Sequence, residues 1–235
     1  MWLLKKKSIT GLVAFFSLLL VFSTSVSANA KIHSASPKST VACEDIRGEV
    51  SYQKDESGKI VKKITKVSDV EEYSKKFGIT LPSPDAEILH ISPVTEIADK
   101  STPTNQPLWI GDLYIKNLEG PREACDSELL KHSYYDYPGG TMSVSQSVQA
   151  SYGGAVSVSA EIINASVSFN VTHSYAVSDS QNVEVPFGKR ASVKAFPVVY
   201  VWQYDIYKKG IFSDSYEGYG WAQKPTGVCF SVVIY

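Results

Sequence analysis

The feature that most constrains this chain is a long alternation of polar and apolar residues between Thr141 and Val185. In the first half of this stretch the apolar side chains fall mainly on even residue numbers, and in the second half on odd numbers. Successive side chains of a strand point to opposite faces, so each half predicts a β-strand with one apolar face and one hydroxyl-lined face. The phase changes at Ile163-Asn164, which separates the two strands.

The polar face of this stretch carries almost no charge. From Pro138 to Phe187 there is no Lys or Arg, and the acids are Glu161, Asp179 and Glu184. Ser, Thr, Asn and Gln take the positions where a solvent-facing sheet usually carries Lys and Glu. Such a face can lie against water or line a lumen. An alternating strand with an apolar outer face is also the weak sequence signature of a membrane-spanning β-hairpin.

The turn of the predicted hairpin has two interpretations. Gly153-Gly154 suits the two-residue turn of a short hairpin. A turn at residues 162–165 instead gives two long arms, from Thr141 to Glu161 and from Ser166 to Val185. The second interpretation explains the change of phase and places Ile162-Ile163 at a tip. Isoleucines at a turn are unfavourable in water unless the fold, a membrane or a partner buries them. This interpretation therefore favours an insertion hairpin.

Residues 1–30 have the pattern of a secretory signal peptide. Lys5–Lys7 supply the positive segment, residues 9–22 are apolar, and Ala28-Asn29-Ala30 suits signal peptidase. We expect cleavage after Ala30, with cleavage after Ala28 as the alternative, and a secreted product. An uncleaved membrane anchor is the competing interpretation, and the short apolar run disfavours it.

The chain has three cysteines, Cys43, Cys125 and Cys229. In an exported chain two of them can pair. Cys125 and Cys229 flank the alternating stretch, so a bond between them would clamp both of its ends. Pairing of Cys43 with either of the other two is the alternative.

The whole sequence predicts a mainly β fold, with an elongated antiparallel sheet and the long Ser/Thr-rich amphipathic hairpin. Residues 31–105 are expected to form a small N-terminal α+β region, and residues 106–235 an antiparallel β domain that contains the 141–185 hairpin. One short helix is expected from Asp69 to Phe77, because Ser68–Glu71 fits a capping box and Gly78 suits a helix end. Other strands are expected at residues 48–53, 59–67, 86–91, 108–116, 191–207 and 230–235. Pro197 restricts the strand at 191–207 to an edge or a bend.

Charge and motif content argue against several functional classes. The formal net charge is -1, without a clustered basic surface, so no nucleic-acid partner is expected. The four histidines have no metal-binding spacing, and no nucleophile elbow, phosphate loop or calcium loop occurs in the sequence. We therefore expect a protein that is not an enzyme and that needs no cofactor and no metal.

The alternating arms are followed by Val183-Glu184-Val185-Pro186-Phe187-Gly188-Lys189 and then by an aliphatic-aromatic strand. Residues 138–207 thereby resemble the aerolysin-like pore-forming toxins of the epsilon-toxin and mosquitocidal-toxin group. Those proteins carry a Ser/Thr-rich insertion hairpin, often followed by a Val-Pro-Pro-Gly-Lys-like turn. Here Phe187 stands where the second proline would be.

The resemblance implies a secreted β protein that forms homo-oligomers on a target membrane or cell-surface receptor. The arms of all subunits would pair into a closed barrel, because an open sheet edge cannot persist in hydrocarbon. The apolar residues expected to face lipid or lead insertion are Val144, Val148, Val156, Val158, Ile162, Ile163, Val167, Phe169 and Val171. The polar residues expected to line the lumen are Ser145, Ser147, Ser157, Ser168 and Asn170.

A second hypothesis is a non-lytic, secreted β-sandwich module that binds carbohydrate or a cell-surface partner. Its alternating arms would be ordinary sheet strands with a hydroxyl-rich wet face. The aromatic clusters at residues 134–137 and 200–221 suit either a sheet core or a platform for a sugar or a lipid headgroup. The hypotheses differ at Val158, which faces lipid in the first and lies in the core in the second.

Overall fold

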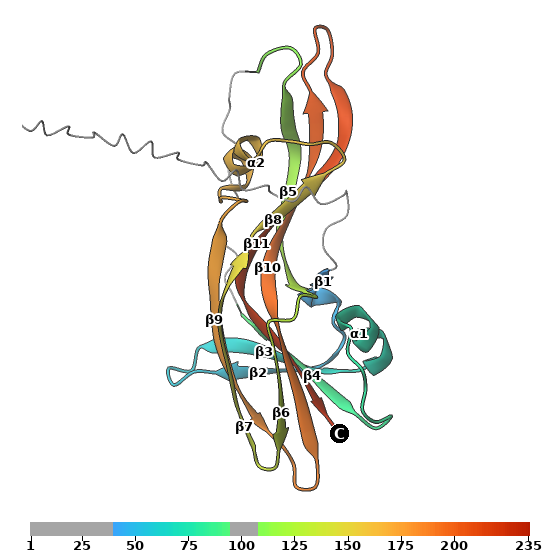
Figure 1. Ribbon diagram of the computed structural model, residues 1–235, viewed down its shortest axis with the longest axis vertical. Helices are drawn as coiled ribbons and strands as arrows, with labels where there is room; N and C mark the ends of the chain where they lie inside the picture. Colours follow the sequence, from blue (N-terminus) through green and yellow to red (C-terminus); the bar gives the residue numbers. More distant parts are fainter. Residues whose placement is uncertain (1–39, 95–107) are drawn as a thin grey trace, which may run out of the picture. The chain divides into compact units, whose positions relative to one another are not determined.

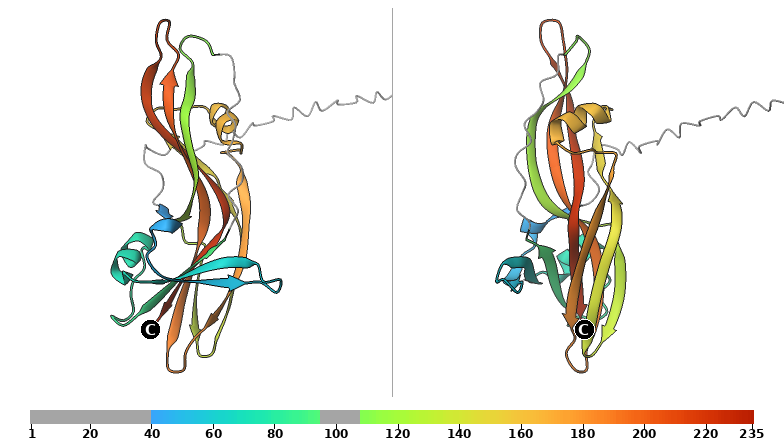
Figure 2. Two further views of the ribbon diagram at one scale, coloured as in Figure 1. Left: turned by 180° about the vertical axis from the view of Figure 1, so that it is seen from behind. Right: turned by 90° about the vertical axis from the view of Figure 1, so that its left-hand side faces the viewer.

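The computed structural model describes residues 40–94 and 108–235, and within them the chain is mainly β, as the alternation predicts (Figures 1 and 2). The described residues also contain two short α-helices and one 3-10 turn. The predicted signal peptide, its cleavage after Ala30 and the expected linker at residues 98–106 lie outside the described residues.

Every strand pairing in the described residues is antiparallel, and the strands form one large and one small sheet. The large sheet has the order β1-β5-β10-β11-β4-β3-β2, with β6 also paired to β10 and β8 to β11. Its strands are β1 (Thr40–Ala42), β2 (Gly48–Lys54), β3 (Ile60–Val67), β4 (Glu87–Pro93), β5 (Leu113–Asp126), β6 (Lys131–Asp136), β8 (Ser151–Gly154), β10 (Arg190–Lys208) and β11 (Ser215–Ile234). The small sheet is β7 (Gly139–Gln149) paired with β9 (Ser174–Glu184).

The long strands β10 and β11 form the centre of the large sheet and pair from Ala191↔Ile234 to Lys208↔Ser215. The other edge of β10 pairs with β6 over residues 190–195 and with β5 over residues 198–208. Pro197 lies where β10 changes partner. Since proline has no backbone N–H to donate, this gap in the ladder is a position that tolerates it. Pro197 was expected only at an edge or a bend of the strand. In the structure it lies in the short interval where one edge of β10 has no paired strand, between β6 and β5.

Strand β5 differs from its prediction, because it starts at Leu113 and runs through Gly120-Pro121, where a strand end was expected. The register with β10 is irregular opposite this dipeptide, between Val201 and Gln203. Gly120 has a φ of +111°, and a Cβ there would come within 2.6 Å of the Val201 carbonyl oxygen. The hydrogen-bond ladder is irregular at Gly120, and this irregularity makes room for Pro121, which a regular ladder would exclude.

The N-terminal strands join the same sheet as the rest of the chain, because β4 pairs with β11 and β3 pairs with β4. Helix α1 (Val70–Phe77) lies between β3 and β4 in the sequence, close to the predicted range. The predicted capping box at Ser68–Glu71 is wrong, because the Ser68 hydroxyl donates to the Arg47 carbonyl and the carboxylate of Asp69 accepts the N–H of Glu72. Asp69 is therefore the cap, and Gly78 ends the helix in a left-handed conformation, as expected. The helix buries Tyr73, Ser74 and Phe77.

Two apolar clusters position the β7–β9 pair and the residues between its strands. In the first, Met142 and Val144 of β7 and Val177 of β9 pack against residues of β10 and β11 such as Phe230. The second surrounds Trp202 and Tyr204 of β10. Figure 1 shows β7 and β9 running alongside β10 and β11, with the short helix α2 (Ala160–Val167) near one end of the pair. The small sheet therefore lies over the centre of the large one.

Candidate functional site

The β7–β9 pair is a separate ribbon. Its register is one-to-one from Gly139↔Glu184 to Gln149↔Ser174, and neither strand shares a ladder with the large sheet in the described part of the chain. Side chains hold it in place: Lys131 Nζ donates to the Ser143 carbonyl at 2.8 Å, and Gln146 Nε2 donates to the Leu130 carbonyl at 2.9 Å. A ribbon attached by side chains can separate from its support without breaking a backbone ladder.

The two faces of this ribbon divide as the sequence predicts. On β7, Val144 is buried and Val148 is half-buried, whereas Ser145 and Ser147 are exposed. On β9, Val177 is buried and packs in the same cluster. The apolar face of the ribbon packs against β10 and β11 rather than facing solvent.

The prediction of two uninterrupted arms is wrong for residues 150–173, which we call the outer segment. Instead of continuing β7, residues 151–154 form β8 and pair with β11, with Gly154 opposite Gly220. Residues 160–167 form α2, where a tight turn was expected. Spacing at i, i+3 and i+4 gives Ile163, Ser166 and Val167 one buried helical face, so tertiary burial overrides the strand preference of the sequence.

The end of α2 is fixed by local hydrogen bonds. Ser168 takes a left-handed conformation with φ +61°, and its N–H donates to the Asn164 carbonyl at 3.2 Å. The Asn164 side-chain oxygen in turn accepts the N–H of Val171 at 2.8 Å. This reverses the chain direction after the helix and brings Phe169 and Val171 back toward the sheet.

The outer segment covers the aromatic cluster of β10. The Phe169 ring lies 4.9 Å from the Trp202 ring, and the Lys224 ammonium of β11 lies 6.0 Å from the centroid of Phe169. The predicted insertion residues in this cluster are buried Ile163, Val167, Phe169 and Val171 and half-buried Val156 and Val158. Val144 and Val148 belong to the other cluster, and Ile162 is half-buried. Of the predicted lumen residues here, Ser157 and Ser168 are exposed and Asn170 is half-buried.

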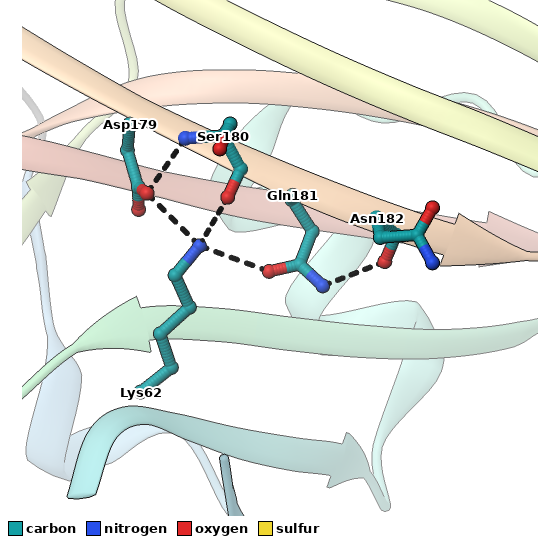
Figure 3. Close-up of polar contacts among 5 residues, drawn as sticks. All are labelled: Lys62, Asp179, Ser180, Gln181 and Asn182. Carbon is teal, nitrogen blue, oxygen red and sulfur yellow. Dashed lines mark hydrogen bonds and ion pairs between the residues drawn. The ribbon is translucent and has the colours of Figure 1, made fainter. Parts of the chain in front are cut away.

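A residue that sequence reasoning missed joins the ribbon to the N-terminal strands. Lys62 of β3 is 8% exposed, and its Nζ lies 2.9 Å from Asp179 Oδ1 (Figure 3). The same ammonium donates to the Ser180 carbonyl at 2.6 Å and to Gln181 Oε1 at 3.1 Å. Its fourth neighbour is the Phe230 ring, 5.2 Å from the nitrogen to the centroid.

These contacts explain two polar residues on the apolar side of β9. Asp179 and Gln181 follow the same alternation as Val177 and Val183, and a carboxylate turned toward a core needs a partner there. Lys62 supplies that partner, and we call this set of contacts the Lys62 clasp. Sequence alone gave no signal for it, because Lys62 is one of several lysines in β3 and lies more than 100 residues away.

The predicted disulfide between Cys125 and Cys229 is confirmed. Cys43 is free and half-buried, yet its Sγ lies only 3.6 Å from Cys125 Sγ. His90 is also close, with Nε2 at 3.7 Å from Cys125 Sγ and Nδ1 at 2.9 Å from the Tyr73 hydroxyl. Burial lowers the pKa of His90 to about 3, so its imidazole is neutral.

Cys43, His90 and Cys125 each have a sulfur or nitrogen atom that could bind a metal, and these atoms lie within 4.8 Å of one another. Zinc, however, binds thiolates, and Cys125 has none to give while it is bonded to Cys229. The arrangement is therefore that of a thiol beside a disulfide.

Comparison with protein-family models gives no match for this chain, and comparison with curated proteins gives none either. Among the described helices, neither is long and apolar enough to cross a bilayer.

Proposed function

We propose that this chain is a secreted β protein that oligomerises on a target membrane and inserts the stretch between Thr141 and Val185 as a β-hairpin. The observation that carries the proposal is the β7–β9 ribbon, which is amphipathic, in register and outside the ladder of the large sheet. The outer segment, residues 150–173, would leave its place over β10 and extend the ribbon.

The register of the ribbon supports this extension. Pairing stops at Gln149↔Ser174 in the folded chain. If the same pairing continued outward along both arms, Val156 would lie opposite Val167. Both would then be on the face of the ribbon that carries Val144. A register shifted by one residue would instead put the apolar residues of the two arms on opposite faces. The outer segment thus keeps a strand pattern that its folded conformation does not use.

The length of the extended ribbon also fits a bilayer. A tilted strand crosses the hydrocarbon core in about 9–11 residues. The observed register, continued outward, puts the turn at residues 161–162 instead of at residues 162–165, where the alternation predicts it. Counted back from there, such a span covers residues 152–161 and 162–171, whose single charged residue is Glu161 at the turn. Asp179 lies outside it, on the part of the ribbon that would remain in water. On this count Val144 and Val148, which the resemblance puts in contact with lipid, would share the face of Val156 but lie outside the span, in the part of the ribbon that would remain in water.

Extension exchanges one apolar environment for another. Ile163, Val167 and Phe169 leave the cluster around Trp202 and enter hydrocarbon, which is about as apolar as a leucine side chain. The losses are the Lys62 clasp, the α2 hydrogen bonds and the β8 pairing. Pairing of the arms with those of neighbouring subunits would replace the lost backbone bonds.

The test is dye release from liposomes by residues 31–235, beside a gel for detergent-resistant oligomers. Val158→Lys puts a charge on the lipid face, which costs about 2–4 kcal/mol at the bilayer midplane. Ser157→Lys is the matched control, because it is the neighbouring residue and faces the opposite side. We expect Val158→Lys to abolish leakage with surface binding retained, and Ser157→Lys to keep leakage.

Unchanged leakage from a folded Val158→Lys protein would contradict the lipid-facing assignment. Loss of leakage in both variants would point to a general effect of added charge rather than to an inserted strand. Val158 is half-buried in the folded chain, so circular dichroism and urea unfolding must first establish that each variant folds.

The non-lytic binding module is the second candidate, and exposed aromatic residues favour it. Tyr134 is 69% exposed and Tyr137 59% exposed, and the Tyr134 ring lies 4.5 Å from that of His132. Exposed tyrosines of this kind can stack on a sugar ring. If residues 31–235 gave neither leakage nor oligomers on several lipid mixtures, this function would be preferred, and Tyr134→Ala would be expected to weaken glycan binding.

A further inference from the structure

Two neighbouring loops carry a cluster of exposed large apolar side chains at one end of the central strands. Trp109 is 78% exposed, Ile110 68%, Ile211 72% and Phe212 101%, and Leu108 beside them is 38% exposed. We call these five residues the apolar tip. Residues 108–112 precede β5, and residues 209–214 connect β10 to β11 at the upper end of Figure 1. Isolated exposed apolar residues are common, but a contiguous group indicates a binding surface.

The two loops are joined by backbone hydrogen bonds. The N–H of Gly111 donates to the Lys209 carbonyl at 2.7 Å, and the N–H of Lys209 donates to the Asp112 carbonyl at 2.8 Å. Asp112 Oδ2 also accepts the N–H of Trp109 at 2.7 Å. The apolar side chains are thus presented by a fixed pair of turns.

A layer of tyrosine and lysine lies behind the tip. The ring of Tyr207 lies 6.0 Å from that of Tyr114 and 5.5 Å from that of Tyr216. Lys116 Nζ lies 4.7 Å from the centroid of Tyr207. Apolar side chains at a tip, with tyrosines and lysines behind and beside them, match a bilayer interface, where aromatic residues and lysines lie at the headgroup level.

The charges of this end favour lipid headgroups. Both acids are engaged within the loops, Asp112 with Trp109 and Asp214 with the Tyr114 hydroxyl, the Gly210 N–H and the Lys209 ammonium. The Tyr114 hydroxyl is the main cause that lowers the pKa of Asp214 to about 2. Lys209 and Lys116 lie 3.2 and 3.8 Å from Asp214, so their charges are partly neutralised. Lys208 is exposed beside them and can complement the phosphate of a lipid headgroup.

The form of the tip distinguishes a bilayer from a protein partner. Phe212 and Trp109 project almost fully from the surface, so a protein would have to offer a matching pocket for each. A bilayer interface needs no such pockets. We propose that the apolar tip is a lipid-docking site that inserts into the interfacial layer of a bilayer.

This inference goes beyond the proposed insertion of the hairpin and stands on other residues. The two are connected in space, because Leu113 and Ile115 of β5, directly after the first tip loop, pack in the same cluster as Ile163 and Val167 of α2. Docking by the tip would therefore hold the outer segment near the membrane before any insertion.

The experiment measures partition of residues 31–235 onto phosphatidylcholine vesicles and onto vesicles with one fifth phosphatidylserine. The double variant Trp109→Ser, Phe212→Ser is compared with the matched control Val50→Ser, Tyr52→Ser, which removes two exposed apolar side chains from β2. We expect at least a tenfold weaker partition for the tip variant and less than a twofold change for the control. Phosphatidylserine should strengthen the partition of the parent, and added salt should remove that gain.

A second readout reports depth. Brominated lipid should quench the fluorescence of Trp109, while Trp202 and Trp221 are buried. Trp109→Phe should keep the partition and lose most of the quenching. Equal partition of the parent and the tip variant, equal loss in the control, or capture of a protein by a tip that binds no vesicle would overturn the proposal. Binding without leakage would support tip docking and count against hairpin insertion, so the two proposals fail separately.

Discussion

Lys62 Nζ lies 2.9 Å from Asp179 Oδ1, and this contact joins β3 in the N-terminal part of the chain to β9 of the separate ribbon (Figure 3). The lysine is 8% exposed and the aspartate side chain 21%. The two charges therefore interact at a site that water reaches poorly, which strengthens the attraction and makes loss of one partner costly.

Replacing Lys62 with methionine should loosen the ribbon. The substitution removes the ammonium that contacts Asp179, Gln181 and the Ser180 carbonyl, and leaves the carboxylate without its cationic partner, with the Ser180 N–H still donating to it. A hydrogen bond to a charged group is worth about 1.5–3 kcal/mol, so we expect the free energy of unfolding in urea to fall by about 2 kcal/mol. Hydrogen exchange should rise in β7 and β9 more than in β10 and β11.

Lys66→Met is the control for this prediction, because it removes a lysine of the same strand from a pair with Glu87 in which both side chains are about half exposed. Exposed pairs contribute about 0–1 kcal/mol, so little change is expected. If Lys66→Met lowered the free energy of unfolding as much as Lys62→Met, the Lys62 clasp would not be a specific source of stability for the ribbon.

Periodicity predicted the faces of the strands because it depends on local geometry. Val144 and Ser145 take opposite faces of β7 as expected, and helix α1 begins and ends at its own capping residues, Asp69 and Gly78. These features are determined by neighbours in sequence. The prediction of the disulfide between Cys125 and Cys229 used position in the chain and is also confirmed.

What the sequence could not predict depends on which surfaces meet. The outer segment has a strand pattern but folds partly as α2, because the Trp202 cluster buries Ile163 and Val167 in that conformation. Lys62 and Asp179 are separated by more than 100 residues, and neither has a local motif. Secondary-structure propensity is a weak guide that tertiary packing can override. In this chain it is overridden in the outer segment, which is also the segment proposed to move.

The stability of the fold should depend on pH through His90. Burial is the main cause that lowers its pKa to about 3, with nearby Lys63 a further one, whereas an unperturbed histidine has a pKa of 6.5. Between these values the unfolded chain binds a proton that the folded chain does not, so stability is full above pH 6.5 and falls as the pH drops. We expect a loss of about 1.4 kcal/mol per pH unit from this residue.

Urea unfolding at pH 7, 6 and 5 measures this dependence. His90→Gln keeps a polar group near the Tyr73 hydroxyl and should flatten the profile between pH 6.5 and 5. His173→Gln is the control, because that side chain is exposed. A profile that stays steep in His90→Gln would assign the pH dependence to other groups.

The disulfide should rearrange at alkaline pH. The Cys43 thiolate can attack Cys125 Sγ, which lies 3.6 Å away, forming a Cys43–Cys125 bond and releasing the Cys229 thiolate. Burial, and then Glu123, raises the pKa of Cys43, so little thiolate exists at neutral pH. Below that pKa the thiolate fraction, and with it the exchange rate, rises about tenfold per pH unit.

Peptide mapping after incubation at pH 7, 8 and 9, acid quench and alkylation of free thiols measures the exchange. We expect alkylated Cys43 at pH 7 and a growing share of alkylated Cys229 at pH 9. Cys43→Ser should keep the Cys125–Cys229 bond at every pH. Exchange that proceeds in Cys43→Ser would have to occur between molecules, and the contact between Cys43 and Cys125 would then not be its cause.

The two adjacent isoleucines of α2 should differ in their effect on stability. Ile163 is 1% exposed in the Trp202 cluster, whereas Ile162 is half-buried. Removing a fully buried isoleucine side chain leaves a cavity and costs about 2–5 kcal/mol, so Ile163→Ala should weaken the fold by that amount. The same change at Ile162 leaves no closed cavity and should cost less than about 1 kcal/mol. Because α2 has few other buried residues, Ile163→Ala should also make residues 155–173 sensitive to protease before the large sheet unfolds.

Limited proteolysis with fragment mapping, together with urea unfolding, distinguishes these outcomes. A strand tip that projected freely, as the alternation of the sequence alone suggests, would make both isoleucines equally dispensable for the folded chain. Equal and small effects of Ile162→Ala and Ile163→Ala would therefore contradict the helical packing of the outer segment. A large effect of Ile163→Ala alone would mean that the residue buried in the folded protein is one that insertion must first release.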